Sequence, residues 1–416
     1  MQMQVSTEVR RIPWLYLSIL AVANALIHSS VNTCFALVPV FMTELDLSLE
    51  AMGLVLMTPL IVRTVTSLPA GILADRIQPR HQASAGLLIV AMGGLIVSQS
   101  TGASTLLTGL VTLSIGQTVY HPATYRIITS LFAAKRRNTA LGLNGSGGTL
   151  GMAAGPITVG LVMLRLGEGS WRLGYLIWVI PAFVLSALAL IIKASTTNVD
   201  GFSSYPAVIQ ERRQHNLRSV LTHDYKLFLM IVGVSSFGVQ LVSAYMTTYL
   251  RGAHAIPVEF ASILFGAMPL TGILAAPIGG YLADRRGEEY AFSLALLGQA
   301  TALAGVAISP NLTTLVPLVL AYGLMQSSTL APSSALVAKL SSPSRIGAAY
   351  AMFSLSSNLS AALAPTIGAV IAQQISIIWI FPFAVAMFMA ALLILRRMAT
   401  IQRINQRVPE RMAQEK

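Results

Sequence analysis

The sequence predicts an all-α membrane protein whose twelve transmembrane helices form two pseudo-symmetric six-helix halves, and three observations lead to this fold class. Hydrophobic residues make up 55% of the 416 residues and charged residues only 10%, whereas a soluble domain carries about 25% charged residues. Apolar runs long enough to cross a bilayer recur along the whole chain. A short motif also recurs half a chain later, which indicates a duplicated unit.

Twelve apolar runs are predicted to be the spans. Because the bilayer core offers no water to unpaired backbone groups, each run is expected to form a helix that satisfies its own hydrogen bonds. The single cysteine excludes a disulfide framework. The spans are expected near residues 14–42, 51–74, 82–100, 105–132, 138–165, 172–193, 227–250, 258–283, 289–308, 312–338, 346–372 and 377–395.

The longest connection between spans sets the domain boundaries. Its glycine, serine, proline and charged residues are typical of a solvated linker rather than a membrane span. The sequence therefore predicts a first six-helix half over residues 1–193, a cytoplasmic linker over 194–226, a second half over 227–398 and a basic cytoplasmic tail over 399–416.

The net charge of +12 is a topology signal rather than the footprint of a nucleic-acid partner. Of the 27 Lys and Arg residues, 22 fall in the termini and in every second loop, and the opposite loops hold only Arg165, Arg172 and Arg251. By the positive-inside rule this places both termini in the cytoplasm. We therefore expect a multi-pass protein of the cell membrane (plasma or bacterial inner membrane), with the lipid bilayer as a partner and no nucleic acid.

Small residues and prolines recur at matching places in the two halves. Small residues four apart let helices approach closely in lipid, and a proline inside a span allows a bend. Span five carries Gly151, Gly155, Pro156 and Gly160 in this pattern, and Pro365 of span eleven follows Pro156 by 209 residues. These positions are predicted to pack and bend the helices.

The repeated motif reads GILADR from Gly71 to Arg76 and GYLADR from Gly280 to Arg285, again 209 residues apart. The first copy resembles the hallmark Gly-x-Leu-Ala-Asp-Arg-x-Gly-Arg-Arg of the major facilitator superfamily, although Gln and Pro stand where it has the later Gly and Arg. The resemblance implies the major facilitator fold and secondary transport by alternating access. It also implies a cytoplasmic latch formed by Gly71, Asp75, Arg76, Gly280, Asp284 and Arg285. In the alternative interpretation, each aspartate only caps its own loop.

The charged groups expected inside the membrane are basic. None of the 15 Asp and Glu residues falls deep within a predicted span, whereas two histidines and two arginines do. A buried arginine is costly in lipid and indicates a cavity or a partner. Arg63 either contacts an anion in a central cavity or bonds the backbone of a neighbouring helix. Arg126 has the same two alternatives and could also extend toward the cytoplasmic surface.

Two pairs of polar residues four apart each share a helix face. His28 precedes Asn32 in span one, and His121 precedes Tyr125 in span four. Each histidine either titrates near neutral pH or is a neutral ring hydrogen-bonded between helices. The predicted substrate and coupling residues are therefore His28, Asn32, Arg63, His121, Tyr125 and Arg126.

The surroundings of these residues resemble the fosmidomycin-resistance branch of the superfamily, and span five resembles that of drug–proton antiporters. The first resemblance rests on His28, His121, Pro122 and Arg126. It implies an exporter of drugs or other small organic compounds. Asn32 and Ala123 replace the branch's acidic residues, so a histidine would carry the proton if transport is proton-coupled at all. The remaining positive groups favour an anionic substrate.

Two other functions stay open, namely an uptake or exchange carrier for anions or organic acids and a non-transporting membrane receptor built on a transporter fold. An enzyme is not expected, because the six histidines are scattered and the sequence has no nucleophile–base set, metal-ligand set or phosphate-binding loop. We therefore expect a small-molecule substrate, a proton as a candidate co-substrate, no cofactor, no metal and activity as a monomer.

Overall fold

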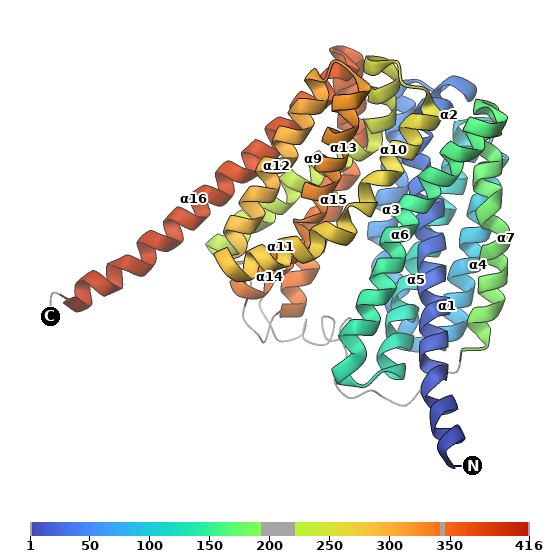
Figure 1. The fold of residues 1–416 in the computed structure, drawn as a ribbon, viewed down its shortest axis with the longest axis horizontal. Coiled ribbons are helices and arrows are strands. Elements are labelled where there is room, and N and C mark those ends of the chain that lie inside the picture. Colours follow the sequence, from blue (N-terminus) through green and yellow to red (C-terminus); the bar gives the residue numbers. More distant parts are fainter. Residues whose placement is uncertain (1, 193–220, 342–345, 415–416) are drawn as a thin grey trace. The chain divides into compact units, whose positions relative to one another are not determined.

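The computed structural model describes residues 2–192, 221–341 and 346–414, and every regular element in these ranges is helical (Figure 1). The predicted all-α class is therefore confirmed. The chain divides into two compact units. Unit 1 comprises residues 1–207, 244–270 and 365–374, and unit 2 comprises 208–243, 271–364 and 375–416. The predicted linker over 194–226 lies largely outside the described residues.

Unit 1 contains the first six predicted spans and parts of three later ones. Its α6 packs against both α1 and α10, and its α5 packs between α3 and α4. Besides the end of α9 (His223–His254) and the end of α15 (Ile346–Gln374), its elements are α1 (Gln2–Ala36), α2 (Val38–Glu44), α3 (Leu49–Arg76), α4 (Pro79–Ser98), α5 (Ala103–Leu131), α6 (Ala134–Leu166), the 3-10 turn η1 (Glu168–Ser170), α7 (Trp171–Leu190) and α10 (Val258–Leu270).

Unit 2 contains the remaining helices of the second half. Its α12 packs against α13 and α16. Besides the first parts of α9 and α15, its elements are α11 (Gly272–Arg286), α12 (Glu288–Ile308), α13 (Leu312–Ser327), α14 (Leu330–Leu340), the 3-10 turn η5 (Ile377–Trp379) and α16 (Ile380–Gln414).

Eleven helices of the described chain are long and apolar enough to cross a membrane. The predicted span missing from this set is α5, a helix of 29 residues. Its mean hydropathy is lower because Gln117, His121 and Arg126 lie in its second half. Since α5 packs among the spanning helices of unit 1, we count it as the twelfth span. This span thus carries three of the predicted site residues, His121, Tyr125 and Arg126.

Three predicted spans are each divided into two helices. The first consists of α1 and α2, the eighth of α10 and α11, and the tenth of α13 and α14. Proline explains the first break, because Pro39 has no N–H to continue the helical ladder. Pro269 and Pro332 lie within a few residues of the other two breaks.

Glycine ends two of the helices. Gly167 follows α6 with φ of +90° and Gly287 follows α11 with φ of +91°, a backbone region that residues with a Cβ adopt only with strain. At the start of α3, the side chain of Ser48 instead accepts a hydrogen bond from the Ala51 N–H at 3.1 Å. Local sequence chemistry therefore accounts for these three helix ends.

Glycines also set the distance between α6 and its neighbours. A Cβ on Gly151 would collide with the carbonyl oxygen of Ala25, and one on Gly155 would collide with that of Ser29. A Cβ on Gly160 would lie 2.7 Å from the Glu259 carbonyl oxygen of α10. Backbones this close place polar side chains of α1 within reach of the α6 carbonyl groups.

Candidate substrate and coupling site

Two histidines from different spans meet inside unit 1. The ring centroids of His28 on α1 and His121 on α5 are 5.7 Å apart, and the rings are tilted by 48°. Tyr125 stacks on His121 one turn further along α5, with centroids 6.3 Å apart. The buried Tyr120 hydroxyl donates to the Leu20 carbonyl at 2.8 Å and so fixes α5 against α1. The structure therefore brings together three of the predicted site residues.

Arg63 of α3 lies beside this histidine pair. Its guanidinium is within electrostatic range of both rings. The same residue lines a cavity of about 20 Å³, which is enough for one water molecule. Cys34 and Ser114 are the other polar lining residues, and the lining includes no Asp or Glu. Arg63, His28 and His121 are cationic or can become so, and they lie in one region of unit 1. No carboxylate lines the cavity beside Arg63.

Arg126 has an unsatisfied donor. Its Nη1 atom is buried and has no hydrogen-bond partner among the described residues. An orphan donor on a charged group is costly to bury, and a bound anion would satisfy it. The alternatives that the sequence leaves for Arg126 therefore stay predictions.

Asn32 contacts a helix rather than the two rings. Its Nδ2 atom donates to the Met152 carbonyl of α6 at 2.7 Å. Two other α1 side chains also donate to α6 carbonyls, Asn24 to Asn144 at 2.8 Å and Ser29 to Gly151 at 3.1 Å. Asn32 is therefore part of a polar seam between α1 and α6, one turn away from His28.

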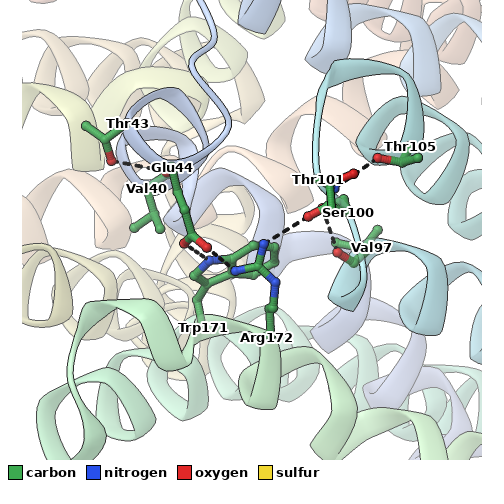
Figure 2. Close-up of polar contacts among 9 residues, drawn as sticks. All are labelled: Val40, Thr43, Glu44, Val97, Ser100, Thr101, Thr105, Trp171 and Arg172. Atoms are coloured by element: carbon green, nitrogen blue, oxygen red, sulfur yellow. Dashed lines mark hydrogen bonds and ion pairs between the residues drawn. The ribbon is translucent and has the colours of Figure 1, made fainter.

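Three sets of ion pairs among the described residues lie near helix ends. Figure 2 shows Glu44, at the end of α2, accepting hydrogen bonds from the Trp171 indole and the Arg172 guanidinium. Arg172 Nη2 also donates to the Ser100 carbonyl at 2.9 Å. Sequence reasoning missed this cluster, although Arg172 stood out as one of three basic residues in the opposite loops.

A second ion pair joins residues far apart in the sequence. Arg251, near the end of α9, donates to Glu168 of η1 at 2.6 Å. In unit 2, Lys339 of α14 pairs with Glu288 at 3.2 Å and with Glu289 at 2.8 Å, both at the start of α12. None of these pairs involves the histidines, so the described carboxylates that form ion pairs do not neutralise the candidate site.

The latch role of the two repeated motifs stays a prediction. Asp284 is exposed and forms no ion pair with a described residue, and nothing is described for the Asp75 side chain. Arg285 lies over the Tyr281 ring, 4.8 Å from its centroid, and Arg76 is exposed. Gly71 is buried and Gly280 is half-buried in their helices.

The predicted bend and packing residues all lie in helices. Pro156 is buried within α6, and Pro365 is buried within α15. The Tyr245 hydroxyl of α9 donates to the Pro365 carbonyl at 2.5 Å. Pro365 therefore lies at a point where a side chain from a neighbouring helix bonds the α15 backbone.

Comparison with known proteins gives a family. The family description "Major Facilitator Superfamily" matches residues 19–254 and again 228–412. The chain is 21% identical over 368 residues to the riboflavin transporter RibZ of Clostridioides difficile, covering 78% of this chain and 80% of that protein. It is 24% identical over 299 residues to a probable L-galactonate transporter of Escherichia coli, covering 68% of this chain and 64% of that protein.

Solved structures agree on the fold. A bacterial homologue of the human lysosomal transporter Spinster, in an inward-facing and unoccupied conformation, matches with a TM-score of 0.75 at 14% identity and covers 94% of this chain and 96% of that one. The nucleoside transporter NupG matches with a TM-score of 0.71 at 16% identity and covers 93% and 98%. Because the family match spans both halves and the relatives are transporters rather than enzymes, this chain belongs to the Major Facilitator Superfamily of multi-pass secondary transporters for small molecules.

Proposed function

We propose that this transporter carries small organic anions by alternating access, with the anion beside Arg63 and the coupling proton on the His28–His121 pair. The observation that supports it most directly is the absence of a carboxylate from the cavity lining beside Arg63. A guanidinium inside a membrane span costs a few kcal/mol unless it is solvated or paired. A carboxylate or phosphonate offers the planar acceptor geometry that a guanidinium binds through two parallel hydrogen bonds.

The charge of the site sets the sign of the coupling. Two unit charges 5.7 Å apart repel by about 3 kcal/mol at an effective dielectric constant of about 20. A proton on one imidazole therefore opposes a proton on the other, and Arg63 opposes both. A bound anion offsets this repulsion, so anion and proton favour each other's binding. Partners that bind cooperatively to one site move across the membrane together, which favours proton–anion symport.

The similarity to a probable L-galactonate transporter supports an acidic substrate, because a galactonate is a carboxylate. The resemblance of spans four and five to drug exporters supports a second candidate, export of small organic compounds or drugs in exchange for protons. In that case substrate and proton compete for the site. The antiporter and the symporter therefore differ in the sign of one measurable coupling.

A pH gradient across proteoliposomes separates the two candidates, whichever way the protein is inserted. A symporter accumulates its substrate in the alkaline compartment, and an antiporter accumulates it in the acidic one. The substrates to test are galactonate, a phosphonate, riboflavin, a nucleoside and an organic cation, with protein-free liposomes as the control for passive entry. Accumulation of the anions in the alkaline compartment, lost in His121→Gln, supports the proposal, and accumulation of cations in the acidic compartment contradicts it.

A further inference from the structure

Asn32 contacts a carbonyl group that its own helix leaves without a donor. In an α-helix, the carbonyl of residue 152 accepts from the N–H of residue 156, but residue 156 is Pro156 and has none. The Asn32 Nδ2 atom donates to this Met152 carbonyl at 2.7 Å. Because a carbonyl oxygen only accepts, the amide nitrogen and not the amide oxygen faces it.

The neighbouring contacts show that α1 is held at this point of α6. Gly151 and Gly155 lie against the α1 backbone, so the two helices are close enough for a short amide to reach across. Ser29 donates to the Gly151 carbonyl at 3.1 Å from the same side. His28, one turn before Asn32, lies against Gly148 of the same α6 face. A change in the Asn32 contact would therefore move the ring that meets His121.

We propose that Asn32 is a positioning residue that satisfies the carbonyl left free by Pro156 and so holds the His28 face of α1 on α6 independently of pH. An amide donates at every pH. An aspartate of nearly the same shape donates only while it carries a proton, and once ionised it repels the carbonyl oxygen. The asparagine thus makes permanent a contact that an acid at this position would make only when protonated.

Other titratable groups near this contact do not supply its donor. The α6 residues that face α1 near Asn32, from Gly148 to Pro156, include none. Titratable or charged groups on α1 itself and on other helices of unit 1 include His28 and Cys34 on α1, Tyr120 and His121 on α5, Arg63 on α3, Tyr175 on α7 and Glu259 on α10. Their titration is common to wild type and Asn32→Ala, so it cancels when the stabilities of these two proteins are compared at each pH. A carboxylate at residue 32 would also interact with the charges of His28 and Arg63, and this interaction is present with and without Pro156, so the Pro156→Ala background corrects for it. The inference holds whatever the substrate is.

Thermal unfolding of the purified protein in detergent, from about pH 5 to about pH 9, tests the proposal. We expect Asn32→Asp to match wild type at the acidic end and to lose about 2 °C or more of apparent Tm at the alkaline end. Asn32→Ala is expected to lose a similar amount at every pH. A difference between Asn32→Asp and wild type that stays constant with pH contradicts the proposal, as does an unchanged Asn32→Ala.

The background variant Pro156→Ala provides the matched control. Alanine restores the N–H at residue 156, which then donates to the Met152 carbonyl and makes the Asn32 contact redundant. In this background, Asn32→Asp is expected to lose the part of its pH dependence that comes from the Met152 carbonyl, and Asn32→Ala is expected to lose most of its destabilising effect. Additive effects of the two substitutions would overturn the assignment, because independent sites add and coupled ones do not.

Discussion

The imidazole rings of His28 and His121 lie 5.7 Å apart although they belong to different spans. At this distance a second proton is opposed by the first, and Arg63 opposes both. The proposed role of the pair is therefore to hold a single proton that responds to the charge of what binds beside it. Span one and span four are separated by two other spans in the sequence, so the meeting of these rings is a property of the fold.

Anion binding is expected to take up protons from solution. Adding a transported anion to purified protein in weakly buffered detergent near neutral pH should raise the pH, because the anion offsets the repulsion that a protonated histidine meets from Arg63 and from the other ring. The uptake should be lost in a His28→Gln and His121→Gln double variant. His81→Gln is the control, since His81 lies outside the site at the start of α4. Proton release on anion binding would contradict the proposed sign of coupling.

Close helix packing predicts a large difference between two glycines of α6. Gly151→Ala should severely destabilise the protein, because the new Cβ would collide with the Ala25 carbonyl oxygen of α1. Gly145→Ala should be neutral or stabilising by up to about 1 kcal/mol, since nothing lies within 4 Å of a Cβ there and alanine favours the helix. Thermal unfolding in detergent compares the two, and equal losses would mean that α1 and α6 are not in close contact.

The break between α1 and α2 leaves another free carbonyl, that of Phe35, because Pro39 has no N–H. The buried Thr247 hydroxyl of α9 donates to it at 3.0 Å. Thr247→Val keeps the shape but removes the donor, which should cost about 1–3 kcal/mol. Cys34, the only cysteine, is buried next to Phe35 and serves as a reporter.

We expect Thr247→Val to speed alkylation of Cys34 by a membrane-permeant maleimide severalfold. Thr112→Val is the matched control, because the Thr112 hydroxyl bonds only the carbonyl of Thr108 in its own helix. If both variants react at the wild-type rate, the hydroxyl of Thr247 does not hold this end of α1 closed.

The Glu44 cluster should matter more than the other ion pairs. Glu44 accepts from both Trp171 and Arg172, and Trp171 is fully buried (Figure 2). Glu44→Gln should therefore cost about 1–3 kcal/mol, whereas Glu168→Gln, which breaks one half-exposed pair with Arg251, should cost at most about 1 kcal/mol. Thermal unfolding at low and high salt checks this order. A loss of stability in Glu168→Gln that equals or exceeds the loss in Glu44→Gln would contradict it.

The sequence predicts the membrane class and the helical fold well because both rest on long apolar runs and an internal repeat. Even α5, which falls short in mean hydropathy, is visible as a span from its length. The breaks within spans one, eight and ten were not predicted, since a proline can bend or end a helix depending on which neighbour bonds the freed carbonyl. In span one, the donor to the freed Phe35 carbonyl is the Thr247 hydroxyl, which comes from a distant part of the chain.

The sequence indicates the residue types of the candidate site but not their contacts. Histidine and arginine stand out within apolar runs, so His28, Arg63 and His121 could be found by composition alone. The sequence pattern places Asn32 with these residues because it shares a helix face with His28, whereas the structure shows its amide bonded to the α6 backbone. No periodicity shows that the carbonyl freed by Pro156 faces α1, because that depends on the close approach at Gly151 and Gly155.

The most direct test of the central claim is the transport of organic anions by Arg63→Gln beside wild type in proteoliposomes. Arg165→Gln is the matched control, since Arg165 is exposed near the end of α6. If Arg63 binds the substrate's acidic group, uptake of anions should fall by at least about tenfold in Arg63→Gln, which corresponds to the loss of about 1.4 kcal/mol of binding, and remain unchanged in Arg165→Gln. Anion transport that survives Arg63→Gln, or wild-type transport that prefers cations, would contradict the account.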